Sequence, residues 1–391
     1  MINIILMGLT SLLADFSSEM VFPILPFFIE TLGGAGLAVG LSFGIGDAVA
    51  AVFKVISGRW ADKTRKYKRF VIAGYAFSAL AKFLYPISNT WRQILAVRPV
   101  ERIGKGFRDA PRDAILSESL PHEQRGRAFG IQRAMDSAGA ILGSLAVLLF
   151  VVYWDFNFSK IFLISAFIAL FAVVPMFFVK VPEQLRMATK SFGFRGLSKD
   201  FSKFVFVGTV FALANFSYAF MILKTQTLFG GLDYKKALTF TLVLYIFFTV
   251  FDSAFSTFIG SLSDKLGRRK IIIFSYVLLA LIFAGFSLIS FIELERTALF
   301  IVLLLLFMLY GLFKSSLDVG QKSFVSDLSG VENRGTALGT FETFTGIAAI
   351  PAGLVAGILW NIDQTLPFIY GLILSVVSII LFTFMINKKS A

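Results

Sequence analysis

Long apolar runs separated by short polar segments dominate the pattern of this 391-residue chain. An apolar window of about 20 residues is long enough to cross a bilayer as a helix. Twelve such windows are present, and we number the predicted spans 1 to 12: 4–29, 36–58, 70–88, 92–115, 127–151, 159–179, 203–228, 236–259, 271–290, 297–317, 336–359 and 366–386. The pattern therefore predicts an all-α integral membrane protein.

Composition agrees with this class and excludes much chemistry. The chain is 57% hydrophobic and 16% charged, whereas soluble domains are about a quarter charged. It has no cysteine and a single histidine, His122, which lies in a polar segment, so thiolate sites, histidine metal sites and a Ser-His-Asp triad are not expected. A GxxxxGK[ST] nucleotide loop is also absent from the sequence. We expect a protein that is not an enzyme and that has no metal and no cofactor.

The net charge of +13 raises the question of nucleic acid, but its distribution indicates a membrane topology instead. Lysine and arginine cluster between spans 2 and 3, between spans 8 and 9, in segment 181–202 and in the tail, whereas the loop between spans 1 and 2 has none. The positive-inside rule then places both termini in the cytoplasm, and we expect a multi-pass protein of the plasma membrane. The N-terminal segment lacks a basic n-region and a cleavage site, so it predicts a retained first span.

Two pairs of motifs recur in the same order along the chain. GRWADKTRKYKR (58–69) matches GSLSDKLGRRK (260–270) at an offset of 202, and ESLPHEQRGRAFG (118–130) matches DLSGVENRGTALG (327–339) at an offset of 209. Repeats of six spans are a known transporter design.

The repeat predicts two six-helix halves. We expect an N-terminal bundle over 1–180, a cytoplasmic linker over 181–202 and a C-terminal bundle over 203–391. This organisation predicts a transporter with a small-molecule substrate, set in the lipid bilayer, without nucleic acid and as a monomer.

The repeated motifs resemble the cytoplasmic signature of the major facilitator superfamily, roughly G-x-L-x-D-[RK]-x-G-R-[RK]-[RK]. The second copy matches it at Gly260, Leu262, Asp264, Lys265, Gly267, Arg268, Arg269 and Lys270. The first copy keeps Gly58, Asp62 and Lys63, but has Trp60 and Arg65 where leucine and the second glycine are usual. The resemblance implies two pseudo-symmetric bundles of six helices around a central cavity, with these motifs as a cytoplasmic gate.

Span 5 resembles the antiporter pattern G-x8-G-x3-G-P. Gly130, Gly139 and Gly143 fit it, and Ser144 stands where proline is expected. The family's fourth-span pattern lies over Arg98, with Glu101 and Arg102 at the usual Gln-Gly positions. The glycine spacing favours the drug/proton antiporter-like branch.

Span 4 carries the most unusual chemistry, because RPVERIGKGFRDAPRDA (98–114) has eight charged residues in seventeen positions. At 100° per residue they share about a 140° arc of one helix. Each would cost about 3 kcal/mol against lipid near mid-bilayer, so they must face protein or water. Two interpretations stay open. The charges either form a salt-bridge lattice, or Arg98, Arg102 and Lys105 meet a substrate in the cavity.

Buried carboxylates are the candidate proton-coupling groups. Asp15 and Glu19 lie one turn apart on span 1, Asp47 lies within span 2, and Glu101 is on span 4. The alternative is that Asp15 and Glu19 only pair with the arginines of span 4. In the C-terminal half, polar groups that can contact a ligand are Asn215, Tyr218 and Tyr310, although ordinary helix packing explains them equally well.

The sequence thus predicts a secondary active transporter that works by alternating access, coupled to protons and exporting organic or amphipathic compounds. An alternative is a transporter of a defined organic or phosphorylated anion, bound by the span 4 cations. Two further classes fit less well. A divalent-metal exporter would have only oxygen ligands to use, and a membrane enzyme or sensor lacks a catalytic set or an output module.

Overall fold

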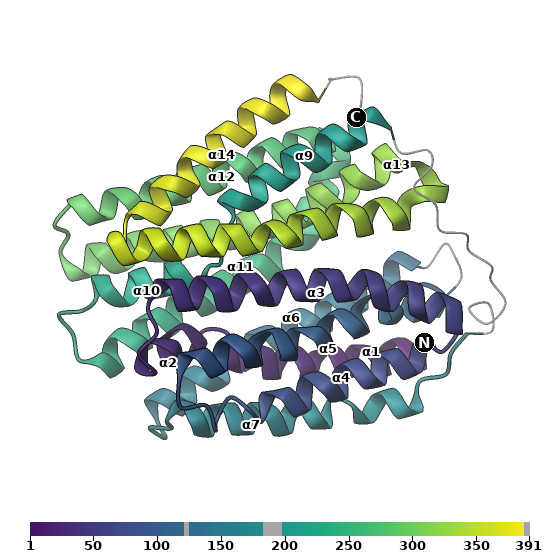
Figure 1. Ribbon diagram of the computed structural model, residues 1–391, viewed down its shortest axis with the longest axis horizontal. Coiled ribbons are helices and arrows are strands. Elements are labelled where there is room, and N and C mark those ends of the chain that lie inside the picture. Colours follow the sequence, from purple (N-terminus) through teal and green to yellow (C-terminus); the bar gives the residue numbers. More distant parts are fainter. Residues whose placement is uncertain (121–124, 183–197, 387–391) are drawn as a thin grey trace. The chain divides into compact units, whose positions relative to one another are not determined.

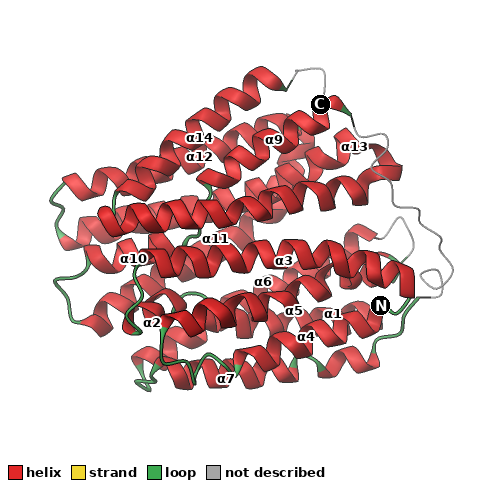
Figure 2. Cartoon of the chain, in the orientation of Figure 1, coloured by secondary structure: helices red, strands yellow, loops and turns green. Residues whose placement is uncertain are grey.

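The computed structural model describes residues 1–120, 125–182 and 198–386. Regular structure within these residues is helical (Figure 2). The chain separates into two compact units, which we call the first and second unit and describe separately. The first comprises Met1–Gly34 and Ile45–Ser191, and the second Ala35–Gly44 and Phe192–Ala391. Most of the predicted linker 181–202 lies outside the described residues.

The first unit contains the helices of predicted spans 1 to 6 (Figure 1). In chain order they are α1 (Ile2–Val21), α2 (Leu25–Thr31), α3 (Gly36–Thr64), α4 (Tyr67–Lys82), α5 (Trp91–Ser117), α6 (Arg125–Val152), α7 (Phe158–Phe171) and the short 3-10 helix η2 (Val174–Phe178). The first residues of α3, Ala35–Gly44, are grouped with the second unit.

The second unit contains the helices of spans 7 to 12. They are α9 (Lys199–Ala214), α10 (Ala219–Leu228), α11 (Tyr234–Leu266), α12 (Arg268–Leu288), the 3-10 helix η3 (Ile289–Phe291), α13 (Arg296–Ile362) and α14 (Leu366–Met385). The α13 element includes spans 10 and 11, whose apolar segments are Arg296–Ser329 and Arg334–Ile362.

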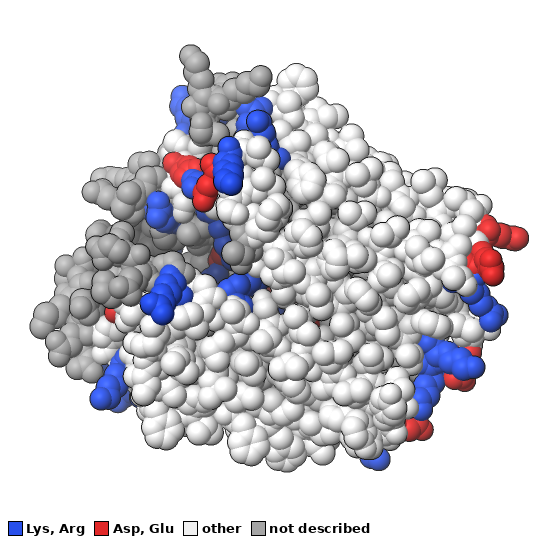
Figure 3. Space-filling view, turned by 180° about the vertical axis from the view of Figure 1, so that it is seen from behind, with Lys and Arg blue, Asp and Glu red and all other residues white. Residues whose placement is uncertain are grey.

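Ten helical segments among the described residues are long and apolar enough to cross a membrane. The helices of the two remaining predicted spans are α4, with 16 residues, and α5, which carries the charged stretch. At 27 residues α5 is long enough to span a membrane, and its charged residues keep it out of the apolar group. Charged side chains gather toward two ends of the surface in Figure 3, and uncharged residues cover most of the area between.

The first helix of each half is interrupted. In span 1, Phe22, Pro23 and Ile24 separate α1 from α2, and Pro23 has no backbone N–H to continue the ladder. In span 7, residues 215–218 separate α9 from α10, although this segment contains neither proline nor glycine. There Asn215 ends α9, and the Ser217 hydroxyl accepts a hydrogen bond from the Ala219 N–H at 3.2 Å.

The two copies of the repeated motif share a backbone turn. Arg65 follows α3 with a φ of 58°, and Gly267 follows α11 with a φ of 89°. These are corresponding positions of the repeat, and both adopt a left-handed conformation that glycine tolerates best. The arginine that departs from the signature thus keeps the geometry of the glycine it replaces.

Packing in the first unit relies on glycine contacts between α1 and α6. A Cβ at Gly139 would meet the backbone of Leu12, and one at Gly143 would meet the backbone of Phe16. The second unit instead has stacked rings in its core. The Phe211 and Tyr276 centroids are 3.7 Å apart, and those of Phe204 and Phe341 are 5.1 Å apart.

Candidate functional site

The charged stretch forms most of α5, the central polar element of the first unit. A capping box begins this helix, because the Gln93 side chain accepts from the backbone N–H of Thr90 at 3.2 Å. Close approach of α4 is possible because Gly74 and Gly104 face each other's backbones. Charged side chains of α5 contact α1, α3 and α4.

The deepest charges of α5 are paired with carboxylates. Arg98 and Glu101 are 1% and 3% exposed, and Arg98 Nη1 donates to Glu101 Oε2 at 2.9 Å. Arg102 pairs through Nη2 with Oδ1 of Asp47 on α3. Asp15 forms no ion pair with a described residue, and the predicted pairing of Glu19 with these arginines stays a prediction.

Two further residues lie next to these arginines. Gly46 leaves room for them, since a Cβ there would lie 3.2 Å from Cγ of Arg102 and 3.3 Å from Cγ of Arg98. The Phe22 ring, in the break of span 1, lies under both guanidinium groups at 4.4 Å and 5.5 Å. An aromatic face adds a favourable cation–π contact to each ion pair.

Lys82 is a buried cation that the sequence analysis did not single out. It is 3% exposed at the end of α4, and its ammonium donates to Ser17 Oγ at 2.6 Å and to Ser18 Oγ at 3.2 Å. Ser17 in turn donates to the Ser165 carbonyl of α7 at 2.7 Å. A lysine inside the predicted span 70–88 was the available signal, because ionisable residues within a membrane segment are functional candidates.

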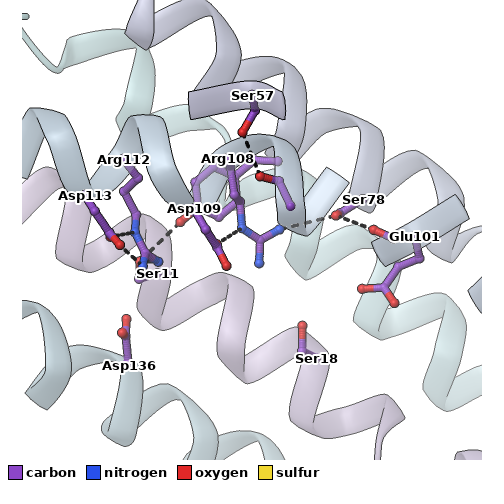
Figure 4. A network of polar contacts seen from close by, with 12 residues as sticks. Ser11, Ser18, Ser57, Ser78, Glu101, Arg108, Asp109, Arg112, Asp113 and Asp136 are labelled. Atoms are coloured by element: carbon purple, nitrogen blue, oxygen red, sulfur yellow. Dashed lines mark hydrogen bonds and ion pairs between the residues drawn. The ribbon is translucent and has the colours of Figure 1, made fainter. Parts of the chain in front are cut away.

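A second polar cluster lies further along α5 (Figure 4). The Arg108 guanidinium stacks 4.3 Å from the Tyr75 ring centroid and donates to Ser78 Oγ at 3.3 Å. Asp109 Oδ1 lies 3.9 Å from Arg108 Nε. The Ser78 hydroxyl donates to the Glu101 carbonyl at 2.9 Å, which joins this cluster to the deeper ion pairs.

Arg112 extends the same cluster toward α1 and α6. Its Nη2 lies 3.0 Å from Oδ1 of Asp113, and its Nη1 donates to Ser11 Oγ at 3.3 Å. Gln132 of α6 donates through Nε2 to Ser11 Oγ and, at 2.9 Å, to Oδ1 of Asp136. Asp136 points from α6 toward Ser11 and Arg112 (Figure 4).

The remaining predicted groups of the first unit are half-buried. Asp15 forms no hydrogen bond or ion pair with a residue that the structure describes, but it lies near enough to Asp136 for the two charges to interact. Glu19 is half-buried one turn further along α1. Lys105 is half-buried on α5, where Asp109 and Asp15 act on its charge.

In the second unit, the predicted contact residues surround the break of span 7. The Tyr218 ring lies 5.8 Å from both Tyr245 and Phe248, and Phe248 lies 5.2 Å from Tyr310. The half-buried side chain of Asn215 makes no hydrogen bond to another described residue. The structure thus brings Tyr218 and Tyr310 into one aromatic cluster.

The predicted gate motifs make contacts inside their own units. In the first, the Tyr67 hydroxyl donates to Asp62 at 2.8 Å, Lys63 is exposed, and Gly58 lies against Ala110. In the second, Arg268 pairs with Asp327 of α13 and lies 3.6 Å from Asp264.

The other members of the second motif are less enclosed. Arg269 donates to the Thr383 carbonyl at 3.2 Å, and Lys265 is exposed. A Cβ at Gly260 would meet nothing within 4 Å. Gly130 of the span 5 motif is equally open, so only Gly139 and Gly143 of that motif are close-packing positions.

The family model described as Major Facilitator Superfamily matches residues 7–292 and 205–391. An MFS-type transporter of Methanocaldococcus jannaschii is 41% identical over 385 residues, covering 98% of this chain and 94% of that protein. The multidrug resistance protein MdtH of Photorhabdus laumondii subsp. laumondii is 32% identical over 142 residues, which are 36% of this chain and 34% of that protein.

Solved structures show the same fold at low sequence identity. A mutant of the nucleoside transporter NupG superposes with a TM-score of 0.82 at 16% identity, covering 98% of this chain and 100% of that one. A POT family transporter in complex with 5-aminolevulinic acid gives 0.76 at 12% identity, covering 97% and 94%. The predicted all-α membrane fold of twelve helices is confirmed.

Proposed function

This chain belongs to the Major Facilitator Superfamily and is a membrane transporter rather than an enzyme, and we propose that it exports organic or amphipathic compounds in exchange for protons by alternating access. The observation that carries the proposal is the pairing of the α5 cations. Arg98, Arg102 and Arg112 each lie against a carboxylate of the first unit, so these three guanidinium groups are matched by negative charge. A neutral or cationic substrate suits this balance.

Proton coupling is assigned to the carboxylates beside α5. Asp15 is the first choice, because it is half-buried, makes no ion pair with a described residue and interacts with Asp136. Glu19 remains a second candidate. Glu101 and Asp47 are better suited to hold Arg98 and Arg102 in place, since they are their ion-pair partners.

The substrate contacts proposed for the second unit are Asn215, Tyr218 and Tyr310. Interrupted helices in corresponding positions of two repeats are the usual pointer to a transporter's binding site. Rings that offer an apolar face and a hydroxyl suit an amphipathic molecule. The partial likeness to the multidrug resistance protein MdtH is consistent with such a substrate. We further propose a monomer in the plasma membrane, with the motifs at Asp62 and Asp264 as the cytoplasmic gate.

The test is proton movement in proteoliposomes that hold an imposed pH gradient. Cationic ethidium, neutral chloramphenicol and anionic carboxyfluorescein would be added in turn to wild type, Asp15→Asn and the matched variant Asp233→Asn, whose carboxylate is exposed before α11. We expect ethidium or chloramphenicol to dissipate the gradient in wild type and Asp233→Asn, but not in Asp15→Asn. A response to carboxyfluorescein alone would overturn the proposal.

A transporter of an organic or phosphorylated anion is the second candidate, and Lys82 is the observation that favours it. This buried ammonium has hydroxyl groups of Ser17 and Ser18 as its hydrogen-bond partners. A cation solvated by neutral groups can accept an anionic ligand at lower cost than one already paired. If carboxyfluorescein responds and Lys82→Gln abolishes that response, the anion candidate replaces the first.

A further inference from the structure

Gln132 stands between a carboxylate and a hydroxyl in the first unit. It is 3% exposed, and its Nε2 donates both to Oδ1 of Asp136 at 2.9 Å and to Oγ of Ser11. Its Oε1 is buried and has no hydrogen-bond donor among the described residues. The NH₂ group of the carboxamide therefore faces Asp136, and its oxygen accepts no hydrogen bond from a described residue.

This orientation matches one protonation state of Asp136. An ionised carboxylate only accepts hydrogen bonds, so the amide must turn its NH₂ group toward it. A protonated carboxyl group has an O–H to donate, and the best partner is then an amide oxygen. Half a turn about the last side-chain torsion of Gln132 exchanges Nε2 for Oε1 without moving the helix.

The same half turn would change the role of Ser11. Its hydroxyl oxygen now accepts from Gln132 and, at 3.3 Å, from Nη1 of Arg112. Its own hydrogen is then left for the Tyr75 hydroxyl, 3.2 Å away. With Oε1 of Gln132 facing it, Ser11 would donate to Gln132 and accept from Tyr75 instead. The direction of the hydrogen-bond chain would reverse.

The reversed chain ends at α5. The Tyr75 ring lies 4.3 Å from the Arg108 guanidinium, which also donates to Ser78. The charged groups that face Asp136 are Asp15 from α1, Arg112 from α5 and Arg133 from its own helix. Protonation of Asp136 thus changes which groups donate and which accept in the hydrogen bonds that join α1, α4 and α5.

We propose that Gln132 is a positioning residue that transmits the protonation state of Asp136 to α5 by a half turn of its carboxamide. The inference rests on the proposed proton coupling. It assigns to a neutral residue the step between proton uptake by Asp136 and the charged residues of α5. Asp136→Asn would hold the amide in the protonated arrangement, since an asparagine NH₂ can donate to Oε1.

The direct test is infrared difference spectroscopy on the full-length protein in lipid nanodiscs, titrated in pH. Labelling glutamine with ¹³C identifies its amide carbonyl band in the unmodified protein, so this arm needs no substitution. We expect a carboxylic acid band and a glutamine amide shift that titrate together, the first lost in Asp136→Asn and the second lost in Gln132→Met. A carboxylic acid band that titrates without any glutamine shift would overturn the inference.

A binding measurement separates this inference from the proposed function. Ethidium affinity would be followed against pH in wild type, Gln132→Met, Gln132→Leu and Gln226→Met, the last a half-buried glutamine of α10 outside this network. We expect affinity in wild type and Gln226→Met to fall by about fivefold or more as pH is lowered, a coupling typical of linked sites, and the two Gln132 variants to lose that dependence. A pH-independent wild type contradicts the proposed function, whereas pH dependence kept in both Gln132 variants contradicts the role of Gln132.

Discussion

Arg65 closes the turn after α3 in a left-handed conformation, with a φ of 58°. A residue with a Cβ pays roughly 1–2 kcal/mol there relative to glycine. We therefore expect Arg65→Gly to stabilise the protein by about 1 kcal/mol, seen as a higher midpoint of thermal unfolding in detergent.

The corresponding position supplies the opposite substitution as its control. Gly267 has a φ of 89°, and a Cβ there would meet nothing within 4 Å. Gly267→Ala should thus lower the unfolding midpoint through backbone strain alone. Equal midpoints for Gly267→Ala and wild type would show that neither turn is strained.

The buried pair Arg98 and Glu101 gives the second residue-level prediction. Arg98 and Glu101 are 1% and 3% exposed, so removal of either side chain's charge leaves the other charge buried without this partner. Such a change typically lowers the free energy of unfolding by about 3–5 kcal/mol. We expect Glu101→Gln and Arg98→Met each to destabilise strongly, and the double variant to be more stable than the sum of the two predicts. Chemical unfolding of all four proteins measures this coupling, and strict additivity would argue against a direct interaction.

At the scale of elements, the three glycines of the span 5 motif separate into two kinds. A Cβ at Gly139 would meet the Leu12 backbone, whereas one at Gly130 would meet nothing within 4 Å. Gly139→Ala should force α1 and α6 apart and cost about 1–3 kcal/mol. Gly130→Ala should be neutral or slightly stabilising, because alanine is the better helix former. Matching losses of thermal stability in both variants would contradict the packing described for α1 and α6.

The start of α14 carries the one pH prediction outside the membrane. The backbone N–H and the hydroxyl of Thr365 hold the pKa of Asp363 below its usual value, the N–H donating to Oδ1 at 2.7 Å. A carboxylate with a lowered pKa in the folded state stabilises the fold above its unfolded pKa, and the contribution disappears as pH falls through the folded pKa. Asp363→Ala should therefore be less stable than wild type at neutral pH and equal to it in acid. The difference should be small, since the group is exposed to solvent. A thermal unfolding series against pH would detect it, and a gap that persists in acid would mean that ionisation of Asp363 does not contribute.

The elements were predictable from sequence to the extent that hydropathy defines them. All twelve predicted spans have helices in the structure. Each window is long enough to predict a helix from its own residues, without information on the helices that pack against it. The break in span 7 was not predictable, since its residues 215–218 contain no proline or glycine. It depends on local side-chain bonds such as the one from Ala219 N–H to Ser217.

The candidate site was predictable in residue type but not in pairing. Burial of the α5 charges follows from the cost of exposing them to lipid. Arg102, however, pairs with Asp47 of α3, and only the rotation of α3 against α5 brings these two side chains together. Gln132 carries no charge, so nothing in the sequence pattern distinguishes it from other polar residues of span 5.

At the scale of the whole molecule, orientation in the membrane is open to a direct experiment, because the natural chain has no cysteine. Single cysteines can be placed at exposed positions: Lys63 and Lys265 in the basic loops, and Tyr153 and Asp233 in the opposite ones. In intact cells, a membrane-impermeant maleimide should label Tyr153→Cys and Asp233→Cys but not Lys63→Cys or Lys265→Cys. Labelling of the basic loops alone would mean that the topology is inverted.

The left-handed turns at Arg65 and Gly267 also bear on how the two halves of the chain arose by duplication. If both halves descend from one six-helix gene, the ancestral turn held a residue suited to a positive φ, which favours glycine. The first copy then exchanged that residue for arginine while the path of the chain stayed the same. The backbone conformation of this turn is thus shared by the two halves although the residue type is not. Traces of the duplication are therefore better sought in backbone angles than in residue identities.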